Sequence, residues 1–296
     1  MLSGLLPAVI VLVTMFTVCL SSVWIVRRKQ LGRRSPLTQQ LLRNPGESLR
    51  QQIDQLNDKV NDCLLATIVV PLIVCIAFLV QIQANPKVTW FVLATYIVFG
   101  LLFAAYMIRK MVGIFDERNN YRLGLDAELA VAQELNQLLA NGCRVFHDFP
   151  AEKFNIDHVV VGPGGVHAVE TKGRAKPDKG RGAADANVKY DGKLLKFPDW
   201  QETAPLEQAK RQAVWLSKWL SSAVGEPVSV NPVLVLPGWY VERTGAGGVT
   251  IFNGKKPHFL SKSNGRETLD EKQIQQIAHQ LEQRCRDIEP TAYRKG

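Results

Sequence analysis

Cysteine is scarce in this sequence, and its spacing excludes several classes of protein. The chain has 296 residues and five cysteines, none of them in a Cys-x-x-Cys pair. A zinc ribbon and a disulfide-stapled small domain are therefore excluded. The glycine-rich segment Gly162–Gly165 lacks the Lys-Ser/Thr sequence of a phosphate loop. No serine or cysteine stands in a recognisable nucleophile context.

Charge is absent from Met1 to Val26, and this absence carries the first structural prediction. At 1.5 Å per residue, a helix of 22 residues spans roughly 33 Å, which is enough for the hydrocarbon core of a bilayer. Residues 1–108 contain three long apolar segments, and the buried helices of a soluble protein would not account for so many in so short a stretch. We therefore expect a transmembrane region over residues 1–108. Its predicted spans are about 5–26, 63–82 and 88–108.

The basic residues between these spans predict their orientation. Residues 27–62 are rich in lysine and arginine, whereas the loop between the second and third spans offers only Lys87. By the positive-inside rule, the N-terminus is outside and the 27–62 loop is cytoplasmic, as is everything after Ile108. We expect a multi-pass membrane protein, and the bacterial inner membrane is the predicted location.

The cytoplasmic loop 27–62 contains a predicted amphipathic helix. Leu49, Ile53, Leu56 and Val60 recur at 4, 3, 4 spacing and form one apolar seam. Two alternatives are open for this seam. It packs on the next domain, which is the default, or it drives homo-oligomerisation, a role that the spans could also take.

After a predicted linker at 109–123, the pattern is typical of an α/β fold, with helices and short apolar strands in alternation. The predicted helices are about 124–140, 205–222 and 269–286, and the predicted strands are about 144–149, 156–161, 166–172, 188–190, 194–197, 233–236 and 249–252. We divide this half into a domain at 124–236 and a C-terminal strand and helix extension at 237–296.

Two carboxylates and a lysine are predicted to meet on one β-hairpin. If the turn at Gly162–Gly165 closes cleanly, Asp157 faces Glu170, and Lys172 lies on the same face. Two opposed carboxylates repel each other, and a divalent cation between them would remove the repulsion. Their hard oxygen ligands suit Mg²⁺ or Mn²⁺. From spacing alone, a metal site and a solvent-facing salt bridge among these residues are equally open.

Four motifs in order connect this segment to a known family. They are Gly124 with Glu128, Asn155-Ile156-Asp157-His158, Gly165 with Glu170-Thr171-Lys172, and Ala204-Pro205-Leu206-Glu207-Gln208. The run from Gly124 to about Leu236 resembles the nuclease-related domain (NERD) family, a branch of the PD-(D/E)XK restriction-endonuclease-like fold. The resemblance leaves the membrane segments outside.

The resemblance implies a metal-dependent nuclease that hydrolyses phosphodiester bonds of nucleic acid on the cytoplasmic side. It implies Asp157 and Glu170 as ligands of Mg²⁺ or Mn²⁺, with Lys172 as the catalytic lysine. Glu128 would approach from the first helix of the domain to hold a metal-bound water or a second ion. Gln208 would support the site or touch the phosphate backbone.

A basic stretch surrounds and follows the lysine of the hairpin. Its members are Lys172, Arg174, Lys176, Lys179, Arg181, Lys189, Lys193 and Lys196. We expect it to grip a phosphate backbone without reading sequence, with Arg174 and Lys176 as contacts and DNA preferred over RNA. The alternative for this stretch is a solvent-exposed charged face without a ligand. The alternative function for the chain is a non-catalytic nucleic-acid-binding or interaction module with a nuclease-like fold at the membrane.

Overall fold

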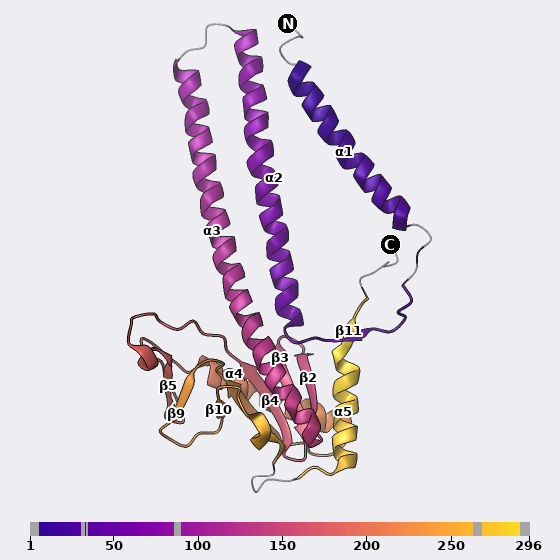
Figure 1. The fold of residues 1–296 in the computed structure, drawn as a ribbon. Coiled ribbons are helices and arrows are strands. Elements are labelled where there is room, and N and C mark those ends of the chain that lie inside the picture. Colours follow the sequence, from indigo (N-terminus) through magenta and orange to yellow (C-terminus); the bar gives the residue numbers. More distant parts are fainter. Residues whose placement is uncertain (1–5, 31–32, 34, 86–89, 263–267, 291–296) are drawn as a thin grey trace. The chain divides into compact units, whose positions relative to one another are not determined.

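A computed structural model describes residues 6–30, 33, 35–85, 90–262 and 268–290 (Figure 1). The chain forms two compact units. The first is drawn from residues 1–39, 55–117 and 290–296, and the second from residues 40–54 and 118–289. Each unit is described by itself below.

The first unit is helical. It contains α1 (Leu6–Gln30), most of α2 (Glu47–Ala84) and the beginning of α3 (Trp90–Leu135). Among the described residues, two helices are long and apolar enough to cross a membrane, namely α2 and the continuous helix Trp90–Asn141. Only 6% of the apolar window of each is buried, unlike the core helix of a soluble protein.

The prediction of three spans is therefore corrected to two candidates. The helix α1 forms over most of the first predicted span, about 5–26, but its last turn carries Arg27, Arg28 and Lys29. A full-length apolar window in α1 would need its first residues. Residue 5 and the side chains of residues 6–9 and 12 lie outside the described part of the chain.

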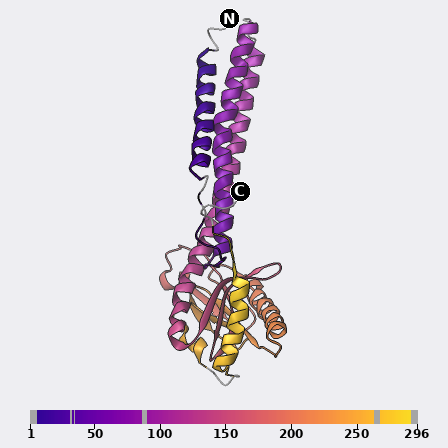
Figure 2. The ribbon, with the colours of Figure 1, turned by 90° about the vertical axis from the view of Figure 1, so that its right-hand side faces the viewer.

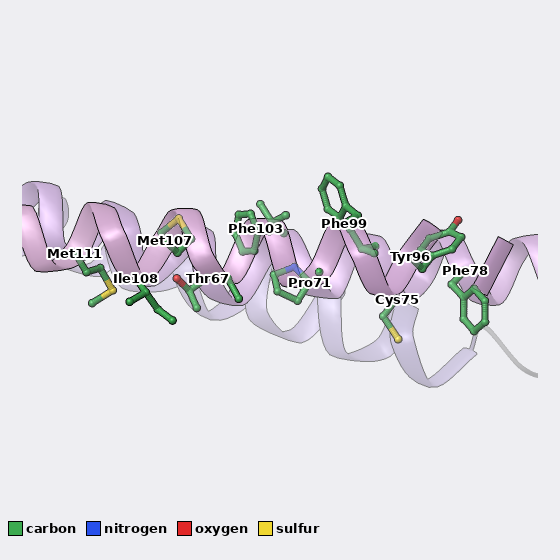
Figure 3. Close-up of a pocket in the computed structure, with 14 residues that line it drawn as sticks. Thr67, Pro71, Cys75, Phe78, Tyr96, Phe99, Phe103, Met107, Ile108 and Met111 are labelled. Carbon is green, nitrogen blue, oxygen red and sulfur yellow. The ribbon is translucent and has the colours of Figure 1, made fainter. Parts of the chain in front are cut away.

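Within this unit, α2 and α3 contact each other through aromatic and polar groups. The Tyr96 hydroxyl donates to Gln81 Oε1 at 2.9 Å, and the Tyr96 ring meets Phe78 edge-on at 5.0 Å. An apolar groove of about 520 Å³ lies along these two helices (Figure 3). Thr67 and Pro71 on α2 and Met111 on α3 are among the residues that line it.

The predicted linker at 109–123 is helical and belongs to α3, so no irregular segment separates the two halves. The predicted helix at 124–140 is the end of α3 followed by the 3-10 helix η2 (Asn136–Asn141). The amphipathic seam likewise belongs to α2, and its members Ile53 and Leu56 are buried.

The second unit is an α/β domain built on a five-stranded sheet. Its strands are β2 (Arg144–Pro150), β3 (Asn155–Gly162), β4 (Gly165–Thr171), β8 (Val230–Val235) and β10 (Thr250–Phe252). They lie in the order β10-β8-β4-β3-β2. The pairs β2–β3 and β3–β4 are antiparallel, whereas β4–β8 and β8–β10 are parallel.

Helices cover both faces of this sheet (Figure 2). On one face, α4 (Ala204–Val224) and α5 (Glu271–Cys285) bury their apolar stripes against β3 and β4. On the other face, the end of α3, η2 and η4 (Pro257–Ser261) pack on the alternate side chains of β3, β4 and β8. Successive side chains of a strand point to opposite faces of the sheet, and here both faces are covered. The strands are therefore apolar at nearly every position.

A smaller sheet holds the predicted hairpin around Asp191-Gly192. Its strands β7 (Gln201–Glu202), β6 (Leu195–Lys196), β5 (Asn187–Tyr190) and β9 (Tyr240–Arg243) lie in that order. A third, two-stranded sheet pairs β1 (Leu41–Leu42) with β11 (Arg286–Ile288). The C-terminal extension is therefore part of the same compact unit as the predicted domain.

A substitution at Leu216 on α4 can measure how much the core between this helix and the sheet contributes to stability. The Leu216 side chain is fully buried in a cluster with Phe149 and Val159. We expect Leu216→Ala to destabilise the domain by about 2–5 kcal/mol, because it removes buried methyl groups and leaves a cavity. Val214→Ala, at an exposed position on the same helix, should change stability by less than about 0.5 kcal/mol. Thermal unfolding followed by tryptophan fluorescence measures both, and equal losses would contradict this packing.

Candidate active site

The β3–β4 hairpin closes with the predicted register. Val161 pairs with Val166 and His158 with Val169, so the next position of β3, Asp157, comes beside Glu170. The turn is tight, and a Cβ on Gly164 would come within 2.3 Å of the Leu260 carbonyl oxygen of η4. Only glycine fits there, which fixes the hairpin and the position of its carboxylates.

Glu170 is the most buried acid of the hairpin, with 1% of its side chain exposed. Lys172 Nζ lies 2.5 Å from Glu170 Oε1, and Gln212 Nε2 on α4 donates to Glu170 Oε2 at 2.6 Å. Gln212 also donates to the Asn155 carbonyl oxygen at 3.2 Å. Both oxygens of this carboxylate are therefore held by donors from two different elements.

Asp157 lies beside this pair at the start of β3. The backbone N–H of Thr171 donates to Asp157 Oδ2 at 2.6 Å. Burial raises the pKa of Asp157 well above its usual value, and the charges of Glu170 and Glu128 raise it further. The Thr171 hydrogen bond and Lys172 oppose this shift without cancelling it.

Glu128 reaches the same place from α3. It is 7% exposed, and its buried Oε2 has no hydrogen-bond partner among the described residues. Burial raises the pKa of Glu128 to about 8, with the charges of Asp148 and Glu170 adding to the effect. Lys172 and a hydrogen bond from the Gly46 backbone lower it. The structure thus brings Glu128, Asp157, Glu170 and Lys172 into one electrostatically coupled group.

Sequence reasoning named Gln208 on α4, but the glutamine that holds Glu170 is Gln212, one helical turn later and 2% exposed. Gln208 is half-buried on the same helix. The signal that could have pointed to Gln212 is its position on the apolar stripe between Ala209 and Leu216, where a polar side chain needs a buried partner.

The basic stretch is largely matched by acids. Its ion pairs are Arg174 with Glu202 at 3.0 Å, Lys179 with Asp199 at 3.0 Å, Arg181 with Asp185 at 2.5 Å and Lys189 with Glu242 at 3.7 Å. Lys176, Lys193 and Lys196 are exposed, and in the part of the chain that the structure describes they make no ion pair. The positive charge that faces solvent is thus smaller than the sequence suggests.

The carboxylate oxygens of Asp157 and Glu170 are of the chemical type that binds Mg²⁺ or Mn²⁺. No three His, Cys, Asp or Glu side chains of the described residues are grouped closely enough to hold one metal ion. Mg²⁺, however, keeps several waters and is commonly held by one or two carboxylates. The unpartnered Glu128 Oε2 and the raised pKa values of Glu128 and Asp157 show that negative charge is under-compensated here. Asp157 and Glu170 would hold such an ion.

Residues 123–237 match the family model described as nuclease-related domain, NERD. This confirms the resemblance that the four motifs carry. The matched segment contains Glu128, Asp157, Glu170, Lys172 and Gln212. Comparison with curated proteins and comparison with solved structures gave no match.

The raised pKa of Glu128 has a consequence for stability. Between its ordinary value of 4.5 and about 8, the folded chain holds a proton that the unfolded chain releases, so stability falls as pH rises through this window. Glu128→Gln removes the buried charge. Without divalent cations, the variant should therefore unfold at a higher temperature than the parent at pH 9, by about 2–4 °C for each kcal/mol recovered. The difference should shrink toward zero at pH 5, and a constant difference across this range would contradict the assignment.

Proposed function

We propose that this chain, which carries a nuclease-related domain at residues 123–237, is a membrane-anchored metal-dependent nuclease that hydrolyses phosphodiester bonds. One observation carries the proposal. Within the matched segment, acids from α3, β3 and β4 influence one another electrostatically, and Lys172 Nζ lies 2.5 Å from one of them, Glu170. Acids whose pKa values are shifted by burial and by neighbouring charges gather at functional sites, which supports this assignment.

The chain's own residues divide the chemistry among them. When bound by Asp157 and Glu170, Mg²⁺ or Mn²⁺ would supply an activated water and stabilise charge that develops on phosphorus. Lys172, 22% exposed, can orient or deprotonate the attacking water, or neutralise the transition state. Glu128 can accept a proton from that water or hold it in place. Gln212 keeps Glu170 in one rotamer.

Nucleic acid is the proposed substrate, with DNA preferred over RNA. Lys176 is an exposed cation of the basic stretch that makes no ion pair among the described residues, and it is close in sequence to the hairpin. Arg174 would contact phosphate in competition with Glu202. When a protein binds nucleic acid through phosphate contacts, its affinity falls steeply as the salt concentration rises. The grip of this chain on a phosphate backbone is therefore salt-sensitive and independent of sequence.

The proposed location is a bacterial inner membrane. The helices α2 and α3 cross it, and residues 27–46 and the nuclease-related domain both lie on the cytoplasmic side. The predicted outside N-terminus would require α1 to cross as well. The two candidate helices support the anchoring, and the basic residues of the 27–62 loop support the orientation. Homo-oligomers would form through the spans rather than through the 49–60 seam, because Ile53 and Leu56 are already buried within the chain.

A second candidate function is a non-catalytic module that holds nucleic acid at the membrane. It is favoured by the absence, among the described residues, of a three-ligand metal group. The two candidates differ in one property, which is metal-dependent cleavage.

Cleavage by the purified full-length chain tests the proposal. With Mg²⁺ or Mn²⁺, it should cut DNA oligonucleotides, and Asp157→Asn or Lys172→Ala should reduce the rate at least about 100-fold. Asp126→Asn removes an exposed acid on the same helix as Glu128 and should leave the rate within about twofold. Intact single- and double-stranded DNA and RNA under all metal conditions would overturn the nuclease and leave the binding module.

Orientation can be measured by cysteine labelling in intact cells. Asn85→Cys, at the end of α2, should react with a membrane-impermeant maleimide from outside. Glu226→Cys, on the surface of the domain, should react only after the cells are permeabilised. The parent chain, with its native cysteines, gives the background. Labelling of both sites in intact cells, or the reverse pattern, would contradict the proposed topology.

A further inference from the structure

A segment far outside the matched domain is built into the second unit. Leu41 and Leu42 form β1 and pair with β11, and the backbone N–H of Arg43 donates to the Cys285 carbonyl oxygen at 3.0 Å. The segment then turns at Gly46 and begins α2 at Glu47. Residues 40–54 thus fold with the nuclease-related domain, although no motif of that domain includes them.

Asp148 on β2 anchors this segment. Its carboxylate is 2% exposed and accepts from Arg43 Nη1 at 2.7 Å, from the Ser48 N–H at 3.1 Å and from the Ser48 hydroxyl at 2.5 Å. Asn155 Nδ2 adds a weaker contact at 3.3 Å. Asp148 also holds a positive φ of 48°, which is uncommon for a residue other than glycine. These charge-assisted hydrogen bonds hold Arg43 and Ser48 in place against the buried carboxylate of Asp148.

Arg43 connects that anchor to the C-terminal strand. Its Nε and Nη2 donate to the two carboxylate oxygens of Asp287, each at 2.8 Å, while Nη1 holds Asp148. The guanidinium is therefore clamped between two acids and is 15% exposed. The paired geometry on Asp287 is one that lysine cannot reproduce.

Gly46 lies between the residues that hold Asp148 and packs close to Glu128. Its φ of +67° suits glycine, and a Cβ there would come within 2.3 Å of Leu125 Cδ1 and 3.5 Å of Glu128 Oε2. The backbone of Gly46 also lowers the pKa of Glu128, so the turn acts on this carboxyl group electrostatically. The turn before α2 therefore lies directly against the acid that α3 contributes to the candidate active site.

We propose that Arg43, Gly46 and Ser48, which we name the 43–48 clamp, position the carboxyl group of Glu128 for cation binding and catalysis. This inference rests on the proposed nuclease function and extends it to residues outside the matched domain. Gly46 and its neighbours are positioning residues, since they act through Glu128. Ser48 of the clamp lies in the first turn of α2, the helix Glu47–Ala84 that is a candidate membrane span.

The expected size of the effect follows from geometry. A displacement of about 1 Å in a catalytic group can cost about 100-fold in rate. A methyl group on Gly46 must push Leu125 and Glu128 away, because the nearest atom lies well inside contact distance. Loss of the Arg43 side chain removes its hydrogen bonds to Asp148 and to Asp287 together, and leaves Ser48 as the remaining donor of the clamp to Asp148.

A double-mutant cycle in the full-length chain tests the clamp. Gly46→Ala should lower kcat about 10- to 100-fold with KM within about twofold. In a Glu128→Gln background, the same change should cost less than about threefold, because its target is already gone. Mn²⁺ affinity, measured by titration and electron paramagnetic resonance without substrate, should fall in the single variant and show the same non-additivity.

Matched variants separate positioning from simple damage. Gly225→Ala places alanine at a similar φ of +84° in open space at the end of α4, and it should leave kcat and Mn²⁺ affinity unchanged. Arg43→Ala should reproduce Gly46→Ala, whereas Arg50→Ala, exposed on α2, should not. Ser48→Thr, which keeps the hydroxyl, should retain more activity than Ser48→Ala.

Each outcome decides between the two proposals. Additive losses in the cycle, or a Gly46→Ala protein with full kcat and Mn²⁺ affinity, overturn the clamp and leave the nuclease standing. Mn²⁺ binding without any cleavage overturns the nuclease, and the affinity cycle then decides the clamp alone. A parent chain that neither cleaves nor binds Mn²⁺ overturns both.

Discussion

The second unit depends on one constraint, which is that several carboxyl groups share a poorly hydrated volume around a single lysine. Glu170 satisfies the constraint through Lys172 and Gln212, whereas Glu128 and Asp157 respond with raised pKa values. Such an arrangement costs stability, because buried charges lose hydration that one ammonium group cannot replace. It persists only where the surrounding fold over-determines the positions of the acids. The rest of the domain provides that surrounding fold.

Each acid is fixed by a different layer of the structure. The β3–β4 hairpin brings Asp157 beside Glu170, and its glycine turn is locked against η4. The helix α4 contributes Gln212 from one face of the sheet. Glu128 arrives on α3, and Gly46 restrains it from the turn before α2. No single element makes the site, so its chemistry depends on the packing of the whole unit.

Two helices extend from the apolar first half of the chain into the second unit. The helix α2 begins at Glu47, where the Ser48 N–H in its first turn donates to Asp148, and α3 runs from the apolar window to Glu128 without a break. The sequence analysis predicted a linker at 109–123, a segment in which charged and apolar residues are mixed. A long helix tolerates that mixture, since helix propensity and the i+4 hydrogen bonds do not require an apolar surface. The apolar window of α3 and the buried acid Glu128 thus lie on one continuous helix.

The sequence by itself determined the local features: the α/β order of elements, the register of the hairpin, the acids Asp157 and Glu170 with Lys172, and the apolar runs of the first half. These follow from alternation, turn chemistry and charge, which act over a few residues. Only the tertiary structure decided that Gln212 rather than Gln208 holds Glu170, that acids neutralise much of the basic stretch, and that Arg43 meets Asp148. The reason is physical: a side chain far along the chain leaves no mark on the local pattern, and its partner is fixed only when the elements pack.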